Sequence, residues 1–265
     1  MRLCRADRVL LSGGVAIAGS TALFGAPLGL AVPAVAMLGL LADGVFRPSS
    51  SVFYPTVVRG SRQAPRIALT FDDGPDPEST PAILDCLAQF GARATFFVIG
   101  RHLERHQALA RQMVAEGHEL GNHSWAHLPW QNFYSSRAHL ADIERTADLI
   151  RSISGSSEEP LYRPPVGLKS PELARAALAR QLKVVAWSVH SRDTFRQRWQ
   201  SIARRVLNRI RNGDIVLLHD GHASEGRHRS NAVNALPLIL CGLQAQELQP
   251  VTVSQLLTAT AAPAQ

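Results

Sequence analysis

The stretch Ile67-Ala68-Leu69-Thr70-Phe71-Asp72-Asp73-Gly74-Pro75 carries the clearest structural signal in the chain. Residues 67–71 form a short apolar run, which predicts a buried β-strand. Gly74-Pro75 predicts a sharp turn that presents Asp72 and Asp73 at the carboxyl end of that strand. Because adjacent carboxylates repel each other, a site that keeps both ionised usually supplies a cation. The plainer alternative is a polar turn or a helix cap.

Further strands alternate with amphipathic helices along the rest of the chain. The predicted strands cover 94–99, a segment ending near His123, 162–163, 183–189, 214–219 and 250–253. One helix is predicted to begin near Ser79-Thr80-Pro81, and another covers about 103–116. About seven strands separated by helices predict an α/β fold with a parallel sheet, either open and doubly wound or closed into a barrel.

The composition fits a folded domain. Charged residues make up 18% of the 265 residues and hydrophobic residues 46%, which excludes a disordered or low-complexity protein. The three cysteines are scattered, which excludes a disulfide framework and a Cys-x-x-Cys metal site. The ten histidines are therefore the residues in which to look for metal chemistry.

Polar residues with catalytic potential follow the predicted strands one after another. They are Asp72 and Asp73, His123 and His127, Arg163, His190 and Asp193, and His219. In an α/β barrel the carboxyl ends of the strands form one rim, so these side chains would converge on a single mouth. This placement predicts an active site.

Two histidines of this set are spaced as metal ligands. His123 and His127 stand at positions i and i+4, which share one face if the segment forms a helical turn. Neutral imidazoles suit zinc, and an added Asp gives two histidines and one carboxylate with open positions for water, as in catalytic sites. A histidine pair by itself is also common in structural roles.

Arg163 and His219 each allow two interpretations. Arg163 precedes Pro164-Pro165 at a rigid turn and is either a surface arginine or the bidentate orienter of a carboxylate. His219 ends a very apolar strand and is either a capped core histidine or a general acid.

Four ordered motifs give the chain a family resemblance. They are Thr70-Phe71-Asp72-Asp73-Gly74-Pro75, His123-Ser124-Trp125-Ala126-His127, Arg163-Pro164-Pro165 and Leu217-Leu218-His219. In this order and spacing they resemble the polysaccharide deacetylases, the NodB-type domains of carbohydrate esterase family four, over about residues 66–257. The resemblance implies a distorted (β/α) barrel and a metal-dependent N-deacetylase of amino sugars.

The resemblance also implies a role for each motif residue. Asp72 would be the general base, and Asp73, His123 and His127 would bind one divalent metal, for which we expect zinc with other first-row metals as alternatives. Arg163 would hold Asp72, His219 would protonate the leaving amine, and Asp193 would tune His219. Substrate contacts are expected from Leu217 (acetyl-methyl pocket), Val166 (backbone N–H for the oxyanion), Pro165, Trp187 and His190.

The chain departs from the family pattern at three positions. Val166 stands where an aromatic residue usually follows the two prolines, and Thr194 replaces a usual Trp. His190 replaces a usual acid and is either a substrate contact or a strand-end histidine. The loss of two rings removes sugar-stacking surface, so an ordinary chitin-like or peptidoglycan groove is less expected.

The N-terminal segment is long and uncharged. No charged residue occurs in the 34 residues from Val9 to Ala42. As one helix they would be about 51 Å long against a hydrocarbon core of about 30 Å, so two spans of about 17 residues with a turn at Gly25-Ala26-Pro27 fit better. We therefore expect a membrane hairpin. A signal peptide cleaved near Ala34-Val35-Ala36 and a single anchor are the alternatives.

The expected location is a bacterial-type inner membrane. Arginines flank both ends of the uncharged segment, so the positive-inside bias puts both ends of a two-span hairpin in the cytoplasm. A single anchor or a signal peptide would put the domain outside the cytoplasm. The predicted organisation is a membrane hairpin or anchor (1–47), a linker (48–65), a catalytic domain (66–257) and a tail (258–265).

These features predict a hydrolase that removes the N-acetyl group from an amino sugar, in an envelope glycan or a lipid-linked saccharide. A rim held near a bilayer would suit the lipid-linked substrate. A deacylase of another amide and a catalytically dead, membrane-anchored carbohydrate-binding module are the alternatives. Nucleic-acid binding is not expected, because the sequence has neither interleaved aromatic residues nor a known binding module.

Overall fold

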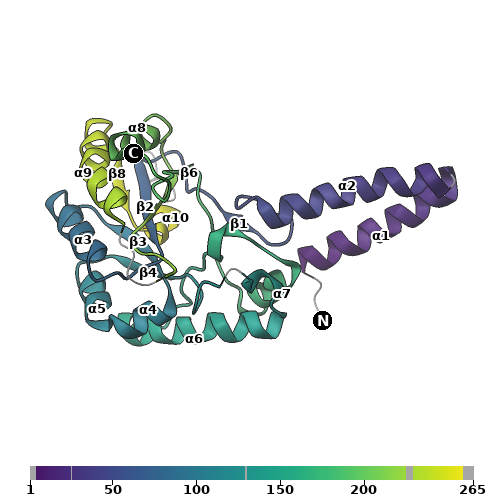
Figure 1. The fold of residues 1–265 in the computed structure, drawn as a ribbon, viewed down its shortest axis with the longest axis horizontal. Helices are drawn as coiled ribbons and strands as arrows, with labels where there is room; N and C mark the ends of the chain where they lie inside the picture. Colours follow the sequence, from purple (N-terminus) through teal and green to yellow (C-terminus); the bar gives the residue numbers. More distant parts are fainter. Residues whose placement is uncertain (1–3, 25, 129, 225–228, 259–265) are drawn as a thin grey trace, which may run out of the picture.

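The main sheet of the molecule is parallel, and helices lie around it (Figure 1). The computed structural model describes residues 4–24, 26–128, 130–224 and 229–258. Five strands lie in the order β4 (Glu119–Asn122), β3 (Ala94–Val98), β2 (Arg66–Asp72), β7 (Ile215–His219) and β6 (Val189–His190). A sixth, β8 (Gln249–Val251), pairs with the start of β2.

A smaller ladder completes the barrel. Strands β1 (Thr56–Val57) and β5 (Val184–Val185) pair in parallel. Tyr162 bridges Asn122 of β4 to Val184 of β5, and Arg59 bridges to Asp214, the residue before β7. These single bridges join the two ladders into a ring. The predicted α/β fold with parallel strands is therefore confirmed, and the barrel is distorted because part of its wall consists of isolated bridges.

Helices connect the strands and cover the outside of the sheet. Ser135 caps the long helix α6 by accepting the Ala138 N–H, and Gly155 ends it with φ 68°. The helices after β2 are α3 (Ser79–Gln89), α4 (Gly100–Arg105), α5 (Gln107–Ala115), α6 (Ser136–Ser154), α7 (Pro171–Arg180), α8 (Trp199–Leu207), α9 (Ser230–Ala245) and α10 (Val253–Thr258). Two short 3-10 helices, η1 (Gln131–Phe133) and η2 (Pro165–Gly167), lie in the loops.

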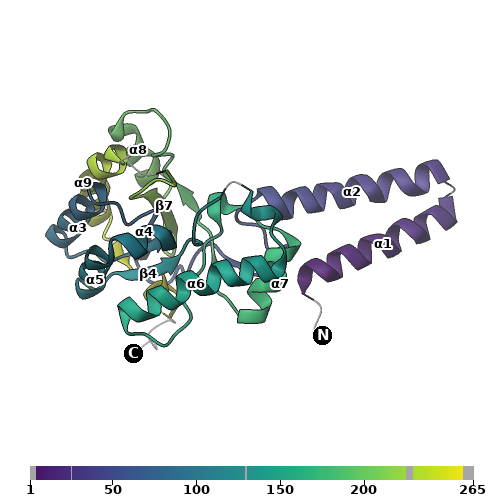
Figure 2. The same ribbon diagram turned by 60° about the horizontal axis from the view of Figure 1, so that its bottom comes forward.

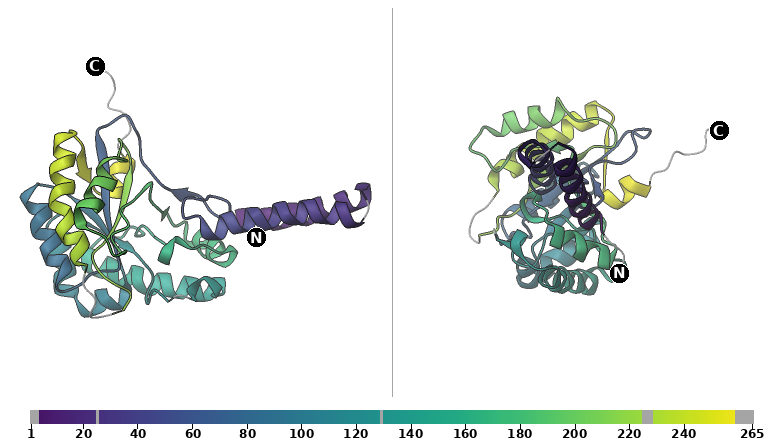
Figure 3. Two further views of the ribbon diagram at one scale, coloured as in Figure 1. Left: turned by 45° about the horizontal axis from the view of Figure 1, so that its top comes forward. Right: turned by 90° about the vertical axis from the view of Figure 1, so that its right-hand side faces the viewer.

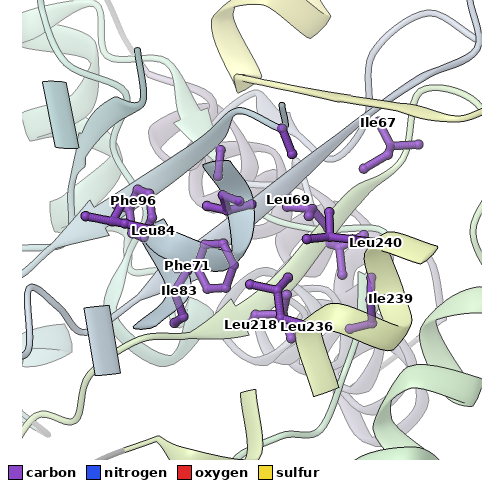
Figure 4. Packing of buried hydrophobic residues seen from close by; sticks show 14 of the residues in the cluster. Ile67, Leu69, Phe71, Ile83, Leu84, Phe96, Leu218, Leu236, Ile239 and Leu240 are labelled. Carbon is purple, nitrogen blue, oxygen red and sulfur yellow. The ribbon is translucent and has the colours of Figure 1, made fainter. Parts of the chain in front are cut away.

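The side chains of β2 alternate between two environments, and this alternation positions the site. Ile67, Leu69 and Phe71 belong to the main core with residues of α3 and α9, as Figure 4 shows. Successive side chains of a strand point to opposite faces, so Thr70 and Asp72 are on the other face. The apolar packing of one face thus fixes the direction of the two polar side chains.

Three predicted elements differ from the structure in their extent. The helix predicted over 103–116 is two helices, α4 and α5, because His106 leaves the helical conformation (φ −118°, ψ 41°). The strand predicted over 183–189 is split into β5 and β6, because the Ala186 N–H binds Val57 O and the Ser188 N–H binds Ile215 O. The strand predicted over 250–253 ends at Val251, and α10 begins at Val253.

The N-terminal segment forms two helices that lie side by side and extend away from the barrel (Figures 1, 2 and 3). They are α1 (Arg5–Phe24) and α2 (Ala26–Phe46). The turn was predicted at Gly25-Ala26-Pro27. Gly25 lies outside the described residues, and Ala26 and Pro27 are the first residues of α2. The helical hairpin is therefore present. Within the described ranges no helix is long and apolar enough to cross a membrane, so the predicted spans are not supported.

Polar contacts join the base of this hairpin to the barrel. The Arg175 guanidinium of α7 lies 2.7 Å from the Asp7 carboxylate of α1. The buried Lys169 Nζ donates to the carbonyl oxygens of Pro48 and Ser50, each at 2.6 Å. Residues 48–65, predicted as a linker, contain β1 and the buried Phe53.

Candidate active site

Asp72 and Asp73 lie at the carboxyl end of β2, where the sequence predicted them. Asp72 is the last residue of the strand and pairs in register with His219 of β7. Asp73 has a positive φ of 77°, which turns the chain out of the strand. Both carboxylates are buried, with 3% and 6% of their residue surface exposed. Two adjacent buried acids need compensating groups, and the surrounding residues supply them.

Asp73, His123 and His127 form one cluster of ligand atoms. The Asp73 Oδ1 lies 3.6 Å from His123 Nε2 and 3.5 Å from His127 Nε2. The three ligand atoms lie within 4.8 Å of one another. The prediction that His123 and His127 share a helical turn is wrong, because Ser124 (φ 69°) and His127 (φ 49°) have left-handed backbone conformations. A tight loop brings the two rings together instead.

The protonation of this cluster suits a cation. His123 Nδ1 lies 2.8 Å from the carbonyl oxygen of Arg163, so Nδ1 carries the proton and the Nε2 lone pair faces Asp73. Burial lowers the pKa of His123 to about 4, which keeps the ring neutral. Burial works to raise the pKa of Asp73, but His127, His219 and His123 hold it below its usual value.

An unpartnered oxygen supports the fit of a metal ion. Asp73 Oδ1 is buried and has no hydrogen-bond donor. A buried carboxylate oxygen without a partner is costly, and a divalent cation between it and the two imidazoles would remove that cost. Two histidines and one carboxylate also match the donors that zinc prefers. These three residues therefore fit a divalent metal.

Arg163 is the counterion of Asp72. Its Nη1 lies 2.6 Å from Asp72 Oδ1 and donates to Thr70 Oγ1 at 2.8 Å. Its other nitrogens donate to the carbonyl oxygens of Val185 and Ala186. The residue is fully buried, and its guanidinium carbon lies 3.9 Å from the centroid of the Phe97 ring. Of the two interpretations left open by the sequence, the orienting one fits these contacts and the surface one does not.

His219 is held by Asp193 on the other side of β2. His219 Nδ1 lies 3.0 Å from Asp193 Oδ1, and the His219 backbone N–H donates to Asp193 Oδ2 at 2.8 Å. Ser191 Oγ also donates to Asp193. Burial alone lowers the pKa of His219, but the Asp193 carboxylate raises it to about 9. The ring therefore carries a proton at neutral pH.

The predicted substrate contacts lie around this centre with different degrees of exposure. Leu217 is buried in β7, two residues before His219. The Trp187 and His190 rings contact each other at a centroid distance of 5.7 Å, and Arg163 lies over the same indole. His190 Nδ1 accepts the Arg192 N–H, so part of its hydrogen-bonding capacity is used locally. Pro165 is buried and Val166 is 64% exposed, both on the η2 loop.

Three residues near the site were given no role from the sequence. His102 Nδ1 lies 2.9 Å from the Asp73 carbonyl oxygen, and the Arg229 guanidinium lies 3.7 Å from Asp73 Oδ2. Asp220 accepts the Gly74 N–H and the Thr80 hydroxyl, and burial raises its pKa to about 7. The available signal for Asp220 was its position directly after His219. His102 and Arg229 lie in helical or loop sequence without any such signal.

Comparisons with known proteins place this geometry in a family. The sequence model of the family described as polysaccharide deacetylase matches residues 59–185. A peptidoglycan-N-acetylglucosamine deacetylase of Bacillus cereus is 42% identical over 195 residues, which cover 72% of this chain and 87% of that protein. The chain belongs to the polysaccharide deacetylase family. The resemblance drawn from the four motifs is thereby confirmed.

Other polysaccharide deacetylases agree with this assignment. A chitooligosaccharide deacetylase of a Bradyrhizobium species is 36% identical over 203 residues, covering 73% of this chain and 91% of that protein. Among solved structures, a peptidoglycan N-acetylglucosamine deacetylase complex has a TM-score of 0.71 and 28% identity, covering 77% of this chain and 94% of that one. The residues matched by the family model, 59–185, include Asp73, His123 and His127.

Proposed function

We propose that this polysaccharide deacetylase is a metal-dependent hydrolase that removes the N-acetyl group from an amino sugar in a cell-envelope glycan. The observation that carries the proposal is the arrangement of three units at one rim. A ligand cluster (Asp73, His123, His127) lies beside an acid with a buried counterion (Asp72 with Arg163) and a protonated imidazole (His219 with Asp193). Amide hydrolysis needs an electrophile activator, a base and an acid, and each unit supplies one.

A divalent metal held by Asp73, His123 and His127 would act as a Lewis acid toward the amide carbonyl. We assign zinc on the basis of the nitrogen and oxygen donors. The neutral state of His123 keeps its Nε2 lone pair available at physiological pH.

Asp72 is the proposed general base. It accepts a proton from the attacking water, while the Arg163 contact at 2.6 Å orients the carboxylate. The new bond forms between the water oxygen and the acetyl carbonyl carbon. The backbone N–H of Val166 is the proposed donor to the developing oxyanion.

His219 is the proposed general acid. The amide C–N bond breaks as the nitrogen receives the His219 proton, giving the free amino sugar and acetic acid, which ionises to acetate in solution. Asp193 keeps that proton on the ring, since the carboxylate raises the pKa of His219 to about 9. The two proton transfers balance, because Asp72 gains one proton and His219 loses one.

We infer an N-acetylglucosamine-containing glycan as the substrate class. Support comes from the similar proteins, which are described as acting on peptidoglycan and on chitooligosaccharides. Leu217 and Trp187 would contact the acetyl methyl and the sugar, with Pro165 and His190 beside them. The low aromatic content of the rim keeps a single lipid-linked saccharide as the second candidate.

The α1–α2 hairpin is proposed to hold the enzyme at a bacterial-type inner membrane. The hairpin exposes large apolar side chains to its surroundings; they include Leu11, Val15, Val32, Val35, Leu38 and Phe46. Exposed apolar surface of this extent marks an interaction with lipid or protein. Membrane fractionation of the full chain and of a variant lacking residues 1–47 tests the proposal. Protease accessibility in spheroplasts identifies the side on which the barrel lies.

The experiment for the activity is acetate release from chitotetraose by the full chain, with and without added zinc. We expect release with zinc and none after treatment with a chelator. Release from a non-sugar N-acetyl amide at an equal rate would favour the general deacylase. Absence of release from every amino-sugar substrate, with binding retained, would favour the carbohydrate-binding module.

A further inference from the structure

A cavity lies beside the η2 loop. It has a volume of about 310 Å3 including its open mouth, and its buried floor has room for one water-sized group. Its walls come from η1, α6 and the segment 162–168. The polar wall residues are Gln131, Asn132, His139 and Tyr162, and Pro165 and Val166 lie at the loop side.

Several unpartnered polar atoms belong to residues that line this cavity. Gln131 Oε1, Asn132 Oδ1, both ring nitrogens of His139 and the Tyr162 hydroxyl are buried and have no hydrogen-bond partner. In the described part of the chain these make up five of the ten such atoms. Gln131, His139 and Tyr162 are each at most 3% exposed. Because an unpaired buried polar group costs stability, five in one cavity indicate a missing ligand group.

The orientation of these groups is fixed before any ligand arrives. The Gln131 Nε2 donates to Asp142 Oδ1 at 3.1 Å, which leaves Gln131 Oε1 as the free end of the amide. Asp142 Oδ1 also accepts the Trp125 N–H, in the loop between His123 and His127. The cavity wall and the metal-ligand loop are therefore connected by hydrogen bonds through one carboxylate.

The wall chemistry selects a neutral hydroxyl. Burial lowers the pKa of His139 to about 4, so the ring is neutral and offers one donor and one acceptor. The amide oxygens of Gln131 and Asn132 accept, and the Tyr162 hydroxyl donates or accepts. Acceptor oxygens on the wall residues disfavour a carboxylate or a phosphate. A hydroxyl both donates and accepts, and it matches the water-sized floor.

The cavity adjoins the catalytic centre through the backbone. Pro165 and Val166 of its wall follow Arg163, whose side chain binds Asp72 and whose carbonyl binds His123. Leu128 of its wall directly follows His127. The cavity wall is therefore continuous along the chain with residues of the catalytic centre.

We propose that the cavity lined by Gln131, Asn132, His139 and Tyr162 is a subsite for a neutral hydroxyl of the sugar unit beside the one that loses its acetyl group. The proposal rests on the proposed function. It makes His139 a specificity residue, whose unpartnered nitrogens are retained for the ligand and not for the fold.

The test variant is His139→Leu, compared with wild type on chitotetraose and on analogues that each lack one hydroxyl. Loss of a neutral hydrogen bond corresponds to a decrease of roughly 5- to 10-fold in kcat/KM, and we expect it in KM with kcat little changed. One deoxy analogue should lower the wild-type value by the same factor and leave His139→Leu unaffected. The unfolding temperature of His139→Leu should equal or exceed that of wild type, because two unpaired polar atoms are removed.

A pair of tyrosine variants provides the matched control. Tyr162→Phe removes an unpartnered hydroxyl, so we expect lower kcat/KM with unchanged stability. Tyr54→Phe removes a hydroxyl that donates to Leu182 O at 3.0 Å and contacts Ala177 O at 3.3 Å, so we expect lower stability with unchanged kcat/KM.

The same comparison is made by calorimetric binding of chitotetraose to Asp72→Asn proteins, which needs no turnover. A loss of affinity caused by His139→Leu in that background supports the subsite even if no acetate is released. Wild-type kcat/KM and affinity in both His139→Leu and Tyr162→Phe would overturn it and assign the cavity to an ordered water only.

Discussion

His123 follows β4 and His219 ends β7, on opposite sides of β2, and the structure gives their rings opposite protonation. Burial by itself lowers the pKa of both. His123 Nδ1 is bonded to a backbone carbonyl, and the pKa of this ring is about 4. His219 Nδ1 is bonded to the Asp193 carboxylate, and the pKa of this ring is about 9. The partner on Nδ1 thus decides which ring is neutral, as the proposed metal ligand needs, and which is protonated, as the proposed acid needs.

The largest expected effect is a difference in metal affinity between variants of the two histidines. His123→Ala removes a ligand, so we expect zinc affinity to fall by at least about 100-fold and acetate release to fall to background. His219→Ala should keep the zinc affinity of wild type and lose only turnover. Calorimetric zinc titration of both proteins provides the measurement. Equal loss of zinc in the two variants would remove the distinction between ligand and acid.

Asp72→Asn tests the carboxylate that lies between the two rings. We expect kcat to decrease by about 10²- to 10⁴-fold, the range for a lost general base, while zinc affinity is retained. The amide keeps the shape of the side chain and the contact with Arg163. Loss of zinc as complete as in His123→Ala would identify Asp72 as a ligand and would leave the site without its base.

Asp193→Asn changes the partner of His219 without touching the ring. The carboxylate is what raises the pKa of His219 to about 9, so its removal should move the alkaline limb of the kcat/KM profile to lower pH. At pH 8 the variant should lose several-fold more activity than at pH 6. A profile that coincides with that of wild type would show that Asp193 does not control the proton.

The smallest expected effect is on stability in the metal-free protein. His219 has a folded pKa above the usual value of about 6.5, so its contribution is full below pH 6.5 and is lost as the pH rises through about 9. His123 has a depressed pKa, so its contribution is lost as the pH falls from 6.5 through about 4. Denaturant unfolding between pH 4 and 10 measures the free energy of unfolding, which should fall at both the acidic and the alkaline end. Asp193→Asn should make the alkaline decrease smaller. Unchanged alkaline slopes in the two proteins would contradict the assignment.

The sequence predicted the site better than the local structure that builds it. The alternation of strands with helices and the four motifs were sufficient for the parallel barrel and for the convergence of Asp72, His123, Arg163 and His219. The assumed helical turn at 123–127 failed, because a spacing of four residues does not distinguish a helix from a loop with two left-handed residues. The outcome was the same, since both conformations bring the two rings to one side.

Other features depend on contacts between distant parts of the chain. His102 binds the Asp73 carbonyl oxygen, and Arg229 approaches the Asp73 carboxylate, yet neither belongs to a motif. The division of 183–189 into two strands follows from a change of partner between Val57 and Ile215. The role of His139 was also hidden, because a histidine in a helical pattern does not indicate whether its nitrogens have partners.

The most direct test is to measure the pKa of each histidine ring in the metal-free protein, from the NMR chemical shifts of the ring nitrogens between pH 4 and 10. We expect His123 to stay neutral until the pH falls to about 4 and His219 to stay protonated until it rises to about 9. In Asp193→Asn the His219 transition should shift to lower pH while the His123 transition remains. Two rings that both titrate near the usual value of about 6.5 would contradict the division of ligand and acid in this site.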